Sequence, residues 1–150
     1  PIEDVRQEVY GDDKYLFPTL PALPLSSVVK VDYNVRGCPM TQIEFLKVFT
    51  SLVMGKDPIE PDHSVCVECK LNENECVYEK GMICLGPVTR AGCDAHCPGV
   101  GQYCTGCRGL VSLPNLKGME EILVEHGLSV DEAWKRLELY NANEVEGVRA

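Results

Sequence analysis

The sequence lacks the features that mark nucleic-acid-binding and membrane-spanning proteins. It has no block of lysine or arginine, and 14 basic residues against 23 acidic ones give a net charge of −9. Phosphate groups bind to basic surfaces, so we expect neither nucleic acid nor an anionic membrane surface as a partner. No apolar run approaches the roughly 18 residues of a transmembrane helix, so we expect no membrane insertion.

The common catalytic patterns of hydrolases and nucleotide enzymes are also missing. We find no Ser/His/Asp set, no glycine loop for a phosphate, no paired-carboxylate arrangement and no internal repeat. The chain begins without a methionine or a secretory signal, and its first residues already have helical periodicity. We therefore expect it to be the C-terminal part of a longer polypeptide.

Cysteine, by contrast, is abundant and concentrated. Eight of the nine cysteines lie between Cys66 and Cys107, and the ninth is Cys38. Disulfide scaffolds are typical of short secreted chains with an even cysteine count, and a redox-active dithiol would need a thioredoxin-like βαβ context. Neither condition is met, so metal ligation is the better interpretation.

The spacing of the clustered cysteines indicates iron–sulfur chemistry. A CxxC pair stands at each end of the group, and such a turn brings two thiolates to one metal centre. Eight thiolates match two [4Fe–4S] clusters with four cysteines each. Gly86-Pro87 and Pro98-Gly99 would let the backbone approach a cluster closely. The eight residues are Cys66, Cys69, Cys76, Cys84, Cys93, Cys97, Cys104 and Cys107.

Zinc is the alternative metal that the residues leave open. One Zn²⁺ ion could join the two CxxC pairs, which would make the chain a zinc-stabilised interaction module without redox function. The separation of the pairs is longer than in ordinary zinc ribbons, however, and four further cysteines would be idle. Iron–sulfur binding is therefore the stronger hypothesis.

Regular structure is expected on both sides of the cysteine-rich segment. Helical periodicity predicts helices over residues 2–10, from Thr41 to Gly55, over 117–126 and from Ser129 to Tyr140. Capping boxes begin two of them, Thr41-x-x-Glu44 and Ser129-x-x-Glu132. The second helix carries an apolar stripe made of Ile43, Leu46, Phe49 and Val53.

The remaining stretches have weaker patterns. Three prolines between residues 17 and 24 predict an extended linker, and β-branched alternation over residues 27–35 predicts a strand. That strand would place Cys38 at a strand-to-helix turn, where ligands often bind in α/β proteins. The alternative is that Cys38 is a buried structural thiol. Residues 57–109 lack periodicity, and residues 141–150 are expected to fray.

Two runs of sequence carry a specific resemblance. Residues 84–93 read CLGPVTRAGC and residues 104–109 read CTGCRG, and together they resemble the small subunit of [NiFe] hydrogenases. The likeness is greatest to the cytosolic sulfhydrogenase and F420-non-reducing types. Gly37-Cys38-Pro39 matches the Gly-Cys-Pro of the proximal-cluster site in that family. The resemblance covers roughly residues 27–110.

This resemblance implies a fold and a division of the chain. The fold class is α+β: the end of a flavodoxin-like α/β domain (1–56), an irregular segment with two [4Fe–4S] clusters (57–110) and a helical tail (111–150). Cys38 would be the last ligand of a proximal cluster whose other ligands lie upstream. Within the cluster segment, the distal ligands would be Cys66, Cys69, Cys76 and Cys84, and the medial ligands Cys93, Cys97, Cys104 and Cys107.

Some neighbours of the cysteines have two interpretations. His63-x-x-Cys66 also fits a ligand pair that would replace Cys69, although four cysteines are the simpler set. His96 could hydrogen-bond cluster sulfur or be exposed. Arg90 and Arg108 could offset cluster charge or be solvated, and His126 would complement a helix C-terminus. We expect no catalytic residue in this chain.

The resemblance also implies a role and a location. The chain would be an electron-transfer subunit in the cytoplasm, and hydrogen would react at the nickel–iron site of a large subunit. Electrons would pass along the clusters to a flavin- or iron–sulfur-containing partner. The alternative within this superfamily is the 20-kilodalton iron–sulfur subunit of complex I, but those proteins hold one cluster and lack eight downstream cysteines.

Overall fold

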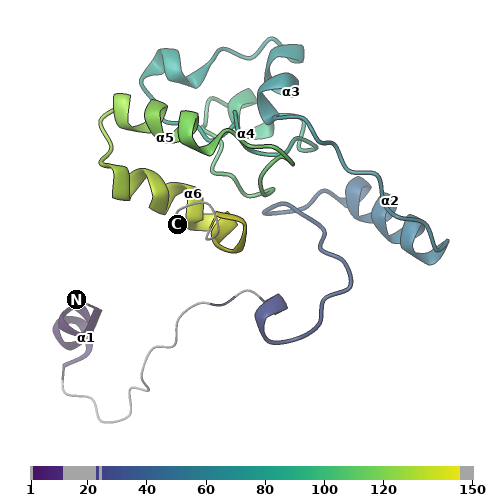
Figure 1. The fold of residues 1–150 in the computed structure, drawn as a ribbon, viewed down its shortest axis with the longest axis horizontal. Helices are drawn as coiled ribbons and strands as arrows, with labels where there is room; N and C mark the ends of the chain where they lie inside the picture. Colours follow the sequence, from purple (N-terminus) through teal and green to yellow (C-terminus); the bar gives the residue numbers. More distant parts are fainter. Residues whose placement is uncertain (1, 12–22, 24, 146–150) are drawn as a thin grey trace. The chain divides into compact units, whose positions relative to one another are not determined.

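Helices of very different lengths are the main regular elements in the described part of the chain. The computed structural model describes residues 2–11, 23 and 25–145, and the chain divides into two compact units, Pro1–Asn34 and Val35–Ala150. The first unit contains α1 (Ile2–Tyr10) and the 3₁₀ helix η1 (Leu25–Ser27). The second contains α2 (Gln42–Val53), α3 (Val65–Leu71), η2 (Val77–Lys80), α4 (His96–Gly99), α5 (Leu116–Glu125) and α6 (Val130–Val145) (Figure 1).

The four predicted helices are confirmed, and two of them, α2 and α6, begin at the predicted capping boxes. At α2 the Thr41 hydroxyl accepts the Glu44 amide hydrogen at 3.2 Å. At α6 the box is complete, because Ser129 and Glu132 each accept the other's backbone N–H, at 3.3 and 2.9 Å. Gly127 follows α5 with a φ of 91°, which suits glycine at a helix end. None of the described helices has the length and apolar composition to cross a bilayer.

The prediction of a strand over residues 27–35 is wrong. Ser27 ends η1, and residues 28–35 form turns, bends and irregular chain. Within the described residues the β-pairing is limited to two isolated bridges, Ser64–Arg90 and Thr89–Leu110. A strand is stabilised by a neighbouring strand, and its β-branched side chains need a surface to pack on. The predicted linker lies outside the described residues, apart from Leu23.

The C-terminal helix is longer than predicted. We expected fraying from Asn141, but α6 continues to Val145 with a kink at Asn141, whose φ is −125°. The Asn141 side chain is buried and donates to the Leu137 carbonyl at 3.0 Å, while Val145 packs in the core. Tertiary burial therefore extends the helix past the end of its sequence periodicity.

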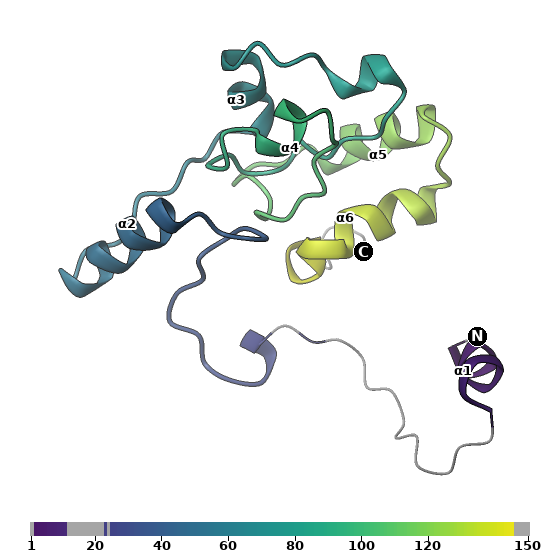
Figure 2. The same ribbon diagram turned by 180° about the vertical axis from the view of Figure 1, so that it is seen from behind.

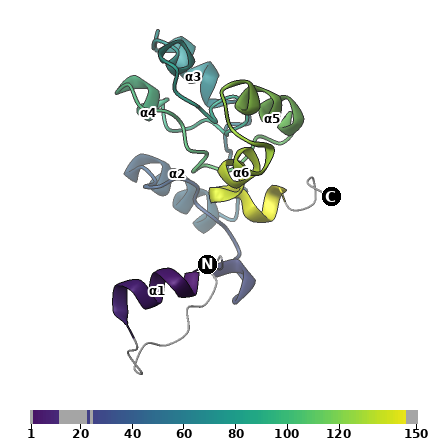
Figure 3. The same ribbon diagram turned by 90° about the vertical axis from the view of Figure 1, so that its left-hand side faces the viewer.

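The main core joins the cysteine-rich segment to the two last helices. Helices α5 and α6 pack on each other (Figure 3). Leu85, Val88 and Leu110 from the cysteine-rich segment pack into the same core. The last helix therefore packs on that segment. The core consists of these residues with Leu116, Met119, Leu123, Ala133, Trp134, Leu137 and Val145.

A second, smaller core lies within the cysteine-rich segment itself. Its buried members are Val65, Val77, Cys84, Ala95 and Cys104. Two of these are cysteines of the predicted ligand sets, so the chain packs around sulfur atoms there. Helices α3 and α4 flank this part of the second unit (Figure 2).

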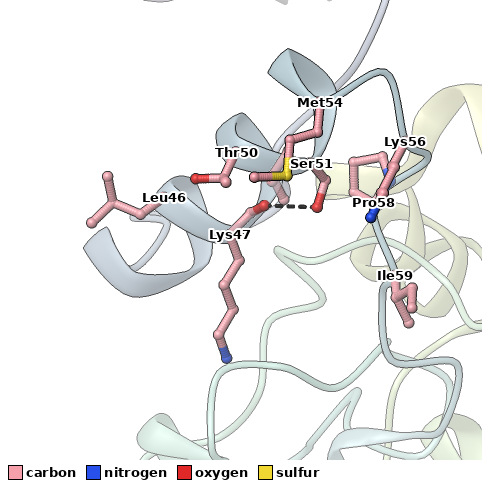
Figure 4. A pocket seen from close by; sticks show the side chains of 9 residues that line it. Leu46, Lys47, Thr50, Ser51, Met54, Lys56, Pro58 and Ile59 are labelled. Carbon is pink, nitrogen blue, oxygen red and sulfur yellow. Dashed lines mark hydrogen bonds between the residues drawn. The ribbon is translucent and has the colours of Figure 1, made fainter.

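Helix α2 turns its predicted apolar stripe outward. Ile43, Leu46, Phe49 and Val53 are all exposed, and Val48 is the buried residue of the helix. A cavity of about 560 Å³ lies between α2 and the chain that follows it, with Met54 and Ile59 among its lining residues. Figure 4 shows this lining and the Ser51 hydroxyl donating to the Lys47 carbonyl at 3.0 Å.

Candidate metal centre

The structure brings four cysteines together around the start of α3. Cys66 and Cys69 lie in the first turns of that helix, Cys76 precedes η2, and Cys84 follows η2. Burial raises the pKa of the Cys66 thiol to about 11, together with the neighbouring Cys84, Cys69 and Cys76, whose negative charge would repel a thiolate. We refer to Cys66, Cys69, Cys76 and Cys84 as the first set.

Backbone atoms close around the sulfur atoms of the first set. A Cβ atom at Gly86 would lie 3.4 Å from both the Cys66 and the Cys84 Sγ, so glycine lets the chain approach both. The Cys104 amide donates to the Cys84 Sγ at 3.3 Å. Cys84 is buried, and this burial raises the pKa of its thiol while backbone N–H groups of Cys104 and Gly86 oppose the effect.

The other four cysteines line a single cavity of about 400 Å³. We refer to them as the second set: Cys93, Cys97, Cys104 and Cys107. The cavity volume is more than ten times the roughly 30 Å³ that one water molecule occupies in liquid water, so the cavity suits a group of several atoms. Burial raises the pKa of Cys104 to about 12, although the Gly106 amide and the Thr89 side chain oppose this shift.

Cys38 lies at the same cavity as the second set. Gly37, Cys38 and Pro39 line it from the loop before α2, and Cys38 itself is exposed. The chain thus places its ninth cysteine beside the medial ligands implied by the resemblance. That Cys38 completes a separate, proximal cluster stays a prediction.

The described residues offer no preformed site for a lone metal ion. No group of three or more Cys, His, Asp and Glu side chains among them is placed to hold one. The two CxxC pairs also fall into different sets, because Cys66 and Cys69 neighbour Cys76 and Cys84 whereas Cys104 and Cys107 line the cavity. Thiols grouped in this way fit the donor chemistry of an iron–sulfur cluster, whose iron atoms each take one cysteine.

The histidines near the cysteines have different surroundings. His63 is exposed, and its backbone carbonyl accepts the Ala91 amide hydrogen at 2.9 Å. His96 is exposed and also lines the cavity of the second set, so a hydrogen bond from it to cluster sulfur stays a prediction. His126 caps α5 and its Nδ1 lies 2.9 Å from the Ile122 carbonyl, so it complements a helix C-terminus as predicted.

Both arginines considered in the sequence pair with carboxylates. Arg90 lies 2.9 Å from Asp62 and donates to the Pro61 carbonyl. Arg108 is only 2% exposed, and its guanidinium forms a two-point ion pair with Glu44. The alternative in which these arginines are merely solvated is therefore wrong.

Arg108 also ties three segments around the second set. Its Nε donates to the Ala91 carbonyl at 2.9 Å, and its Nη1 donates to the Arg36 carbonyl at 3.2 Å. A Cβ atom at Gly92 would lie 2.5 Å from the Arg108 Nη2, so only glycine leaves room for the guanidinium. Arg36 precedes the Cys38 loop, and Ala91 precedes Cys93.

Sequence reasoning missed two side chains that act on the second set. Glu68 and Asn72 are four residues apart, one in α3 and one at its C-cap, and both hydrogen-bond the loop that carries Cys93. Their i, i+4 spacing was the available signal, because residues so spaced share a helix face. The irregular pattern of the segment gave no indication of a helix there.

Metal binding to both sets is expected to strengthen as the pH rises. The raised pKa values of Cys66 and Cys104, about 11 and about 12, mean that the metal-free thiols keep their protons at neutral pH. Ligation requires thiolates, so each such thiol releases a proton, and affinity should rise by up to about tenfold per pH unit for each proton. Cd²⁺ titration of the metal-free chain at several pH values measures this slope, and an affinity independent of pH would contradict it.

Comparison with known proteins identifies the family of this chain. The chain is 43% identical over 124 residues to the sulfhydrogenase 2 subunit delta of Pyrococcus furiosus, a match that covers 82% of the chain and 52% of the relative. The chain is a homologue of hydrogenase subunits. The resemblance inferred from the cysteine motifs is thereby confirmed, and no protein-family model matches the chain.

Two further hydrogenase subunits match over shorter shares of their length. A subunit of the vhu F420-non-reducing hydrogenase of Methanocaldococcus jannaschii is 36% identical, over 57% of the chain and 36% of the relative. The F420-non-reducing hydrogenase iron-sulfur subunit of Archaeoglobus profundus is 30% identical, over 73% of the chain and 43% of the relative. The chain thus spans about half, or less, of the length of the relatives that it matches.

Proposed function

We propose that the chain is an electron-transfer subunit of a [NiFe] hydrogenase. The first and second sets would each hold one [4Fe–4S] cluster, the distal and the medial one. The observation that carries this proposal is that Cys66, Cys69, Cys76 and Cys84 neighbour one another, while the other four clustered cysteines line one cavity together with Cys38. The relative named as an iron-sulfur subunit supports the same cofactor.

The clusters would supply one-electron redox chemistry, and the residues of the chain would shape their surroundings. Buried Cys84 and Cys104 keep part of each set away from water. The Cys104 amide that donates to the Cys84 Sγ joins a residue of the second set directly to a sulfur of the first. This contact would give electrons a short hydrogen-bonded connection between the two sites.

The remainder of the assembly would come from partner chains. Hydrogen would be split or formed at the nickel–iron site of a large subunit, and a flavin- or iron–sulfur-containing subunit would exchange electrons at the other end. Cys38 would belong to a proximal cluster between the large subunit and the second set. We further propose a cytoplasmic complex, in which residues 1–56 end a flavodoxin-like domain, residues 57–110 hold the clusters and residues 111–150 form the tail.

Metal analysis of anaerobically purified chain tests the proposal. Two four-cysteine sites predict about eight iron and about eight acid-labile sulfide per chain, with two interacting [4Fe–4S] signals in low-temperature EPR after dithionite reduction. Stoichiometric zinc without sulfide would overturn the electron-transfer role and indicate a structural metal module. A protein with the clusters should be brown, and a zinc protein colourless.

A further inference from the structure

The loop that carries Cys93 has an unusual backbone. Asp94 and Ala95 have φ values of 56° and 47°, and Gly92 before them has a φ of 115°. Left-handed conformations are unfavourable for residues other than glycine, and they persist where surrounding contacts hold them. Ala91 and Ala95 are both fully buried, so packing holds the chain before and after Cys93.

Two side chains from the α3 region hold this loop. The Glu68 carboxylate accepts the Gly92 amide hydrogen at 2.7 Å and the Ala95 amide hydrogen at 3.0 Å. Asn72 donates to the Asp94 carbonyl at 3.0 Å and to its carboxylate at 2.9 Å. N–H groups that converge from such a backbone form a natural anion site, and here a carboxylate of the chain itself fills it.

The position of Glu68 links the two cysteine sets. It lies between Cys66 and Cys69, inside the CxxC of the first set, yet its Oε2 lies 4.0 Å from the Cys93 Sγ of the second set. A negative charge at this distance disfavours further negative charge on the sulfur and on whatever metal group it ligates. It also takes up two N–H groups that could otherwise stabilise a reduced cluster.

We propose that Glu68 is a positioning residue that fixes the Cys93 loop onto α3 and lowers the reduction potential of the cluster held by the second set. This inference rests on the proposed function, because it concerns a cluster at these cysteines. Arg108 donates to the Ala91 carbonyl next to this loop, but its ion pair with Glu44 partly compensates its charge. Glu68 therefore biases the second set toward a lower potential than its cysteines alone would give.

The test is a redox titration of the full, cluster-containing chain, followed by EPR. In Glu68→Gln the reduction potential of one of the two clusters should rise by at least about 59 mV. For a one-electron couple, this rise changes the oxidised-to-reduced ratio tenfold at a fixed solution potential. Glu121→Gln is the matched control, because it removes the same charge from an exposed position on α5. Its potentials should match those of the wild-type chain.

Two further variants separate charge from mechanical support. Asn72→Ala removes the second tie to the loop without a change of charge, so its shift should be much smaller than that of Glu68→Gln. If Glu68→Gln fails to retain the second cluster, Glu68→Asp carries the test, because it keeps the charge and should keep the low potential.

The outcomes distinguish this inference from the proposed function. Equal potentials in Glu68→Gln and wild type, with both clusters present, would overturn the role of Glu68 alone. An Asn72→Ala shift as large as that of Glu68→Gln would overturn the charge effect, as would a raised potential in Glu68→Asp. A wild-type chain without iron or sulfide would instead overturn the proposed function.

Discussion

Replacing Cys97 by alanine is expected to lower the iron content from about eight toward about four per chain, whereas replacing Cys38 should leave it unchanged. Both residues are exposed and both line the cavity of the second set, so the two variants are closely matched. They differ in the role we assign to them. Cys97 would be one of four ligands of a complete site, and Cys38 one ligand of a site whose other ligands lie outside this chain.

Iron and sulfide analysis with low-temperature EPR measures the difference. In Cys97→Ala the magnetic interaction between the two reduced clusters should disappear, because one partner is lost. A three-iron cluster retained in this variant would still identify Cys97 as a ligand, since one iron has then lost its cysteine. Loss of iron from Cys38→Ala together with full iron in Cys97→Ala would contradict the assignment and place Cys38 in the second set.

The helices α1, α2, α5 and α6 could be predicted from the sequence because their signals are local. The Ser129-x-x-Glu132 box forms as expected, with both reciprocal bonds in place. At Thr41-x-x-Glu44 only the hydroxyl bond forms as the pattern predicts, and the Glu44 carboxylate pairs with Arg108, which lies 64 positions away in the sequence. A local pattern contains no information about a partner at that separation.

The strand and the loop contacts could not be predicted, for a related reason. A strand is stable only beside another strand, and the described chain provides none next to residues 28–35. The cysteine spacing indicated two metal sites, but it gave no sign that a residue inside one CxxC would hydrogen-bond the loop of the other set. Glu68 reaches Gly92 and Ala95 only because α3 and that loop meet in three dimensions.

Replacing Arg108 by methionine is expected to destabilise the chain by about 3–5 kcal/mol, the usual cost of removing one partner from a buried ion pair. Arg108 is almost fully buried and makes its ion pair with Glu44 in a largely enclosed position. Methionine fills part of the volume but leaves the Glu44 carboxylate without its cation. It also removes the hydrogen bonds to the Ala91 and Arg36 carbonyls.

Urea unfolding of the cluster-containing chain, compared under identical anaerobic conditions, measures this cost. Lys135→Met is the matched control, because Lys135 pairs with Asp131 on the exposed face of α6 and should contribute about 0.5 kcal/mol or less. Equal midpoints for the two variants would show that the buried pair contributes no more than a surface pair. A large loss of stability confined to Arg108→Met would show that one guanidinium stabilises the Cys38 loop, α2 and the Cys93 loop.

In that case Arg108→Met should also increase the rate at which iodoacetamide alkylates Cys38, because the Arg36 carbonyl next to that loop loses its hydrogen-bond donor.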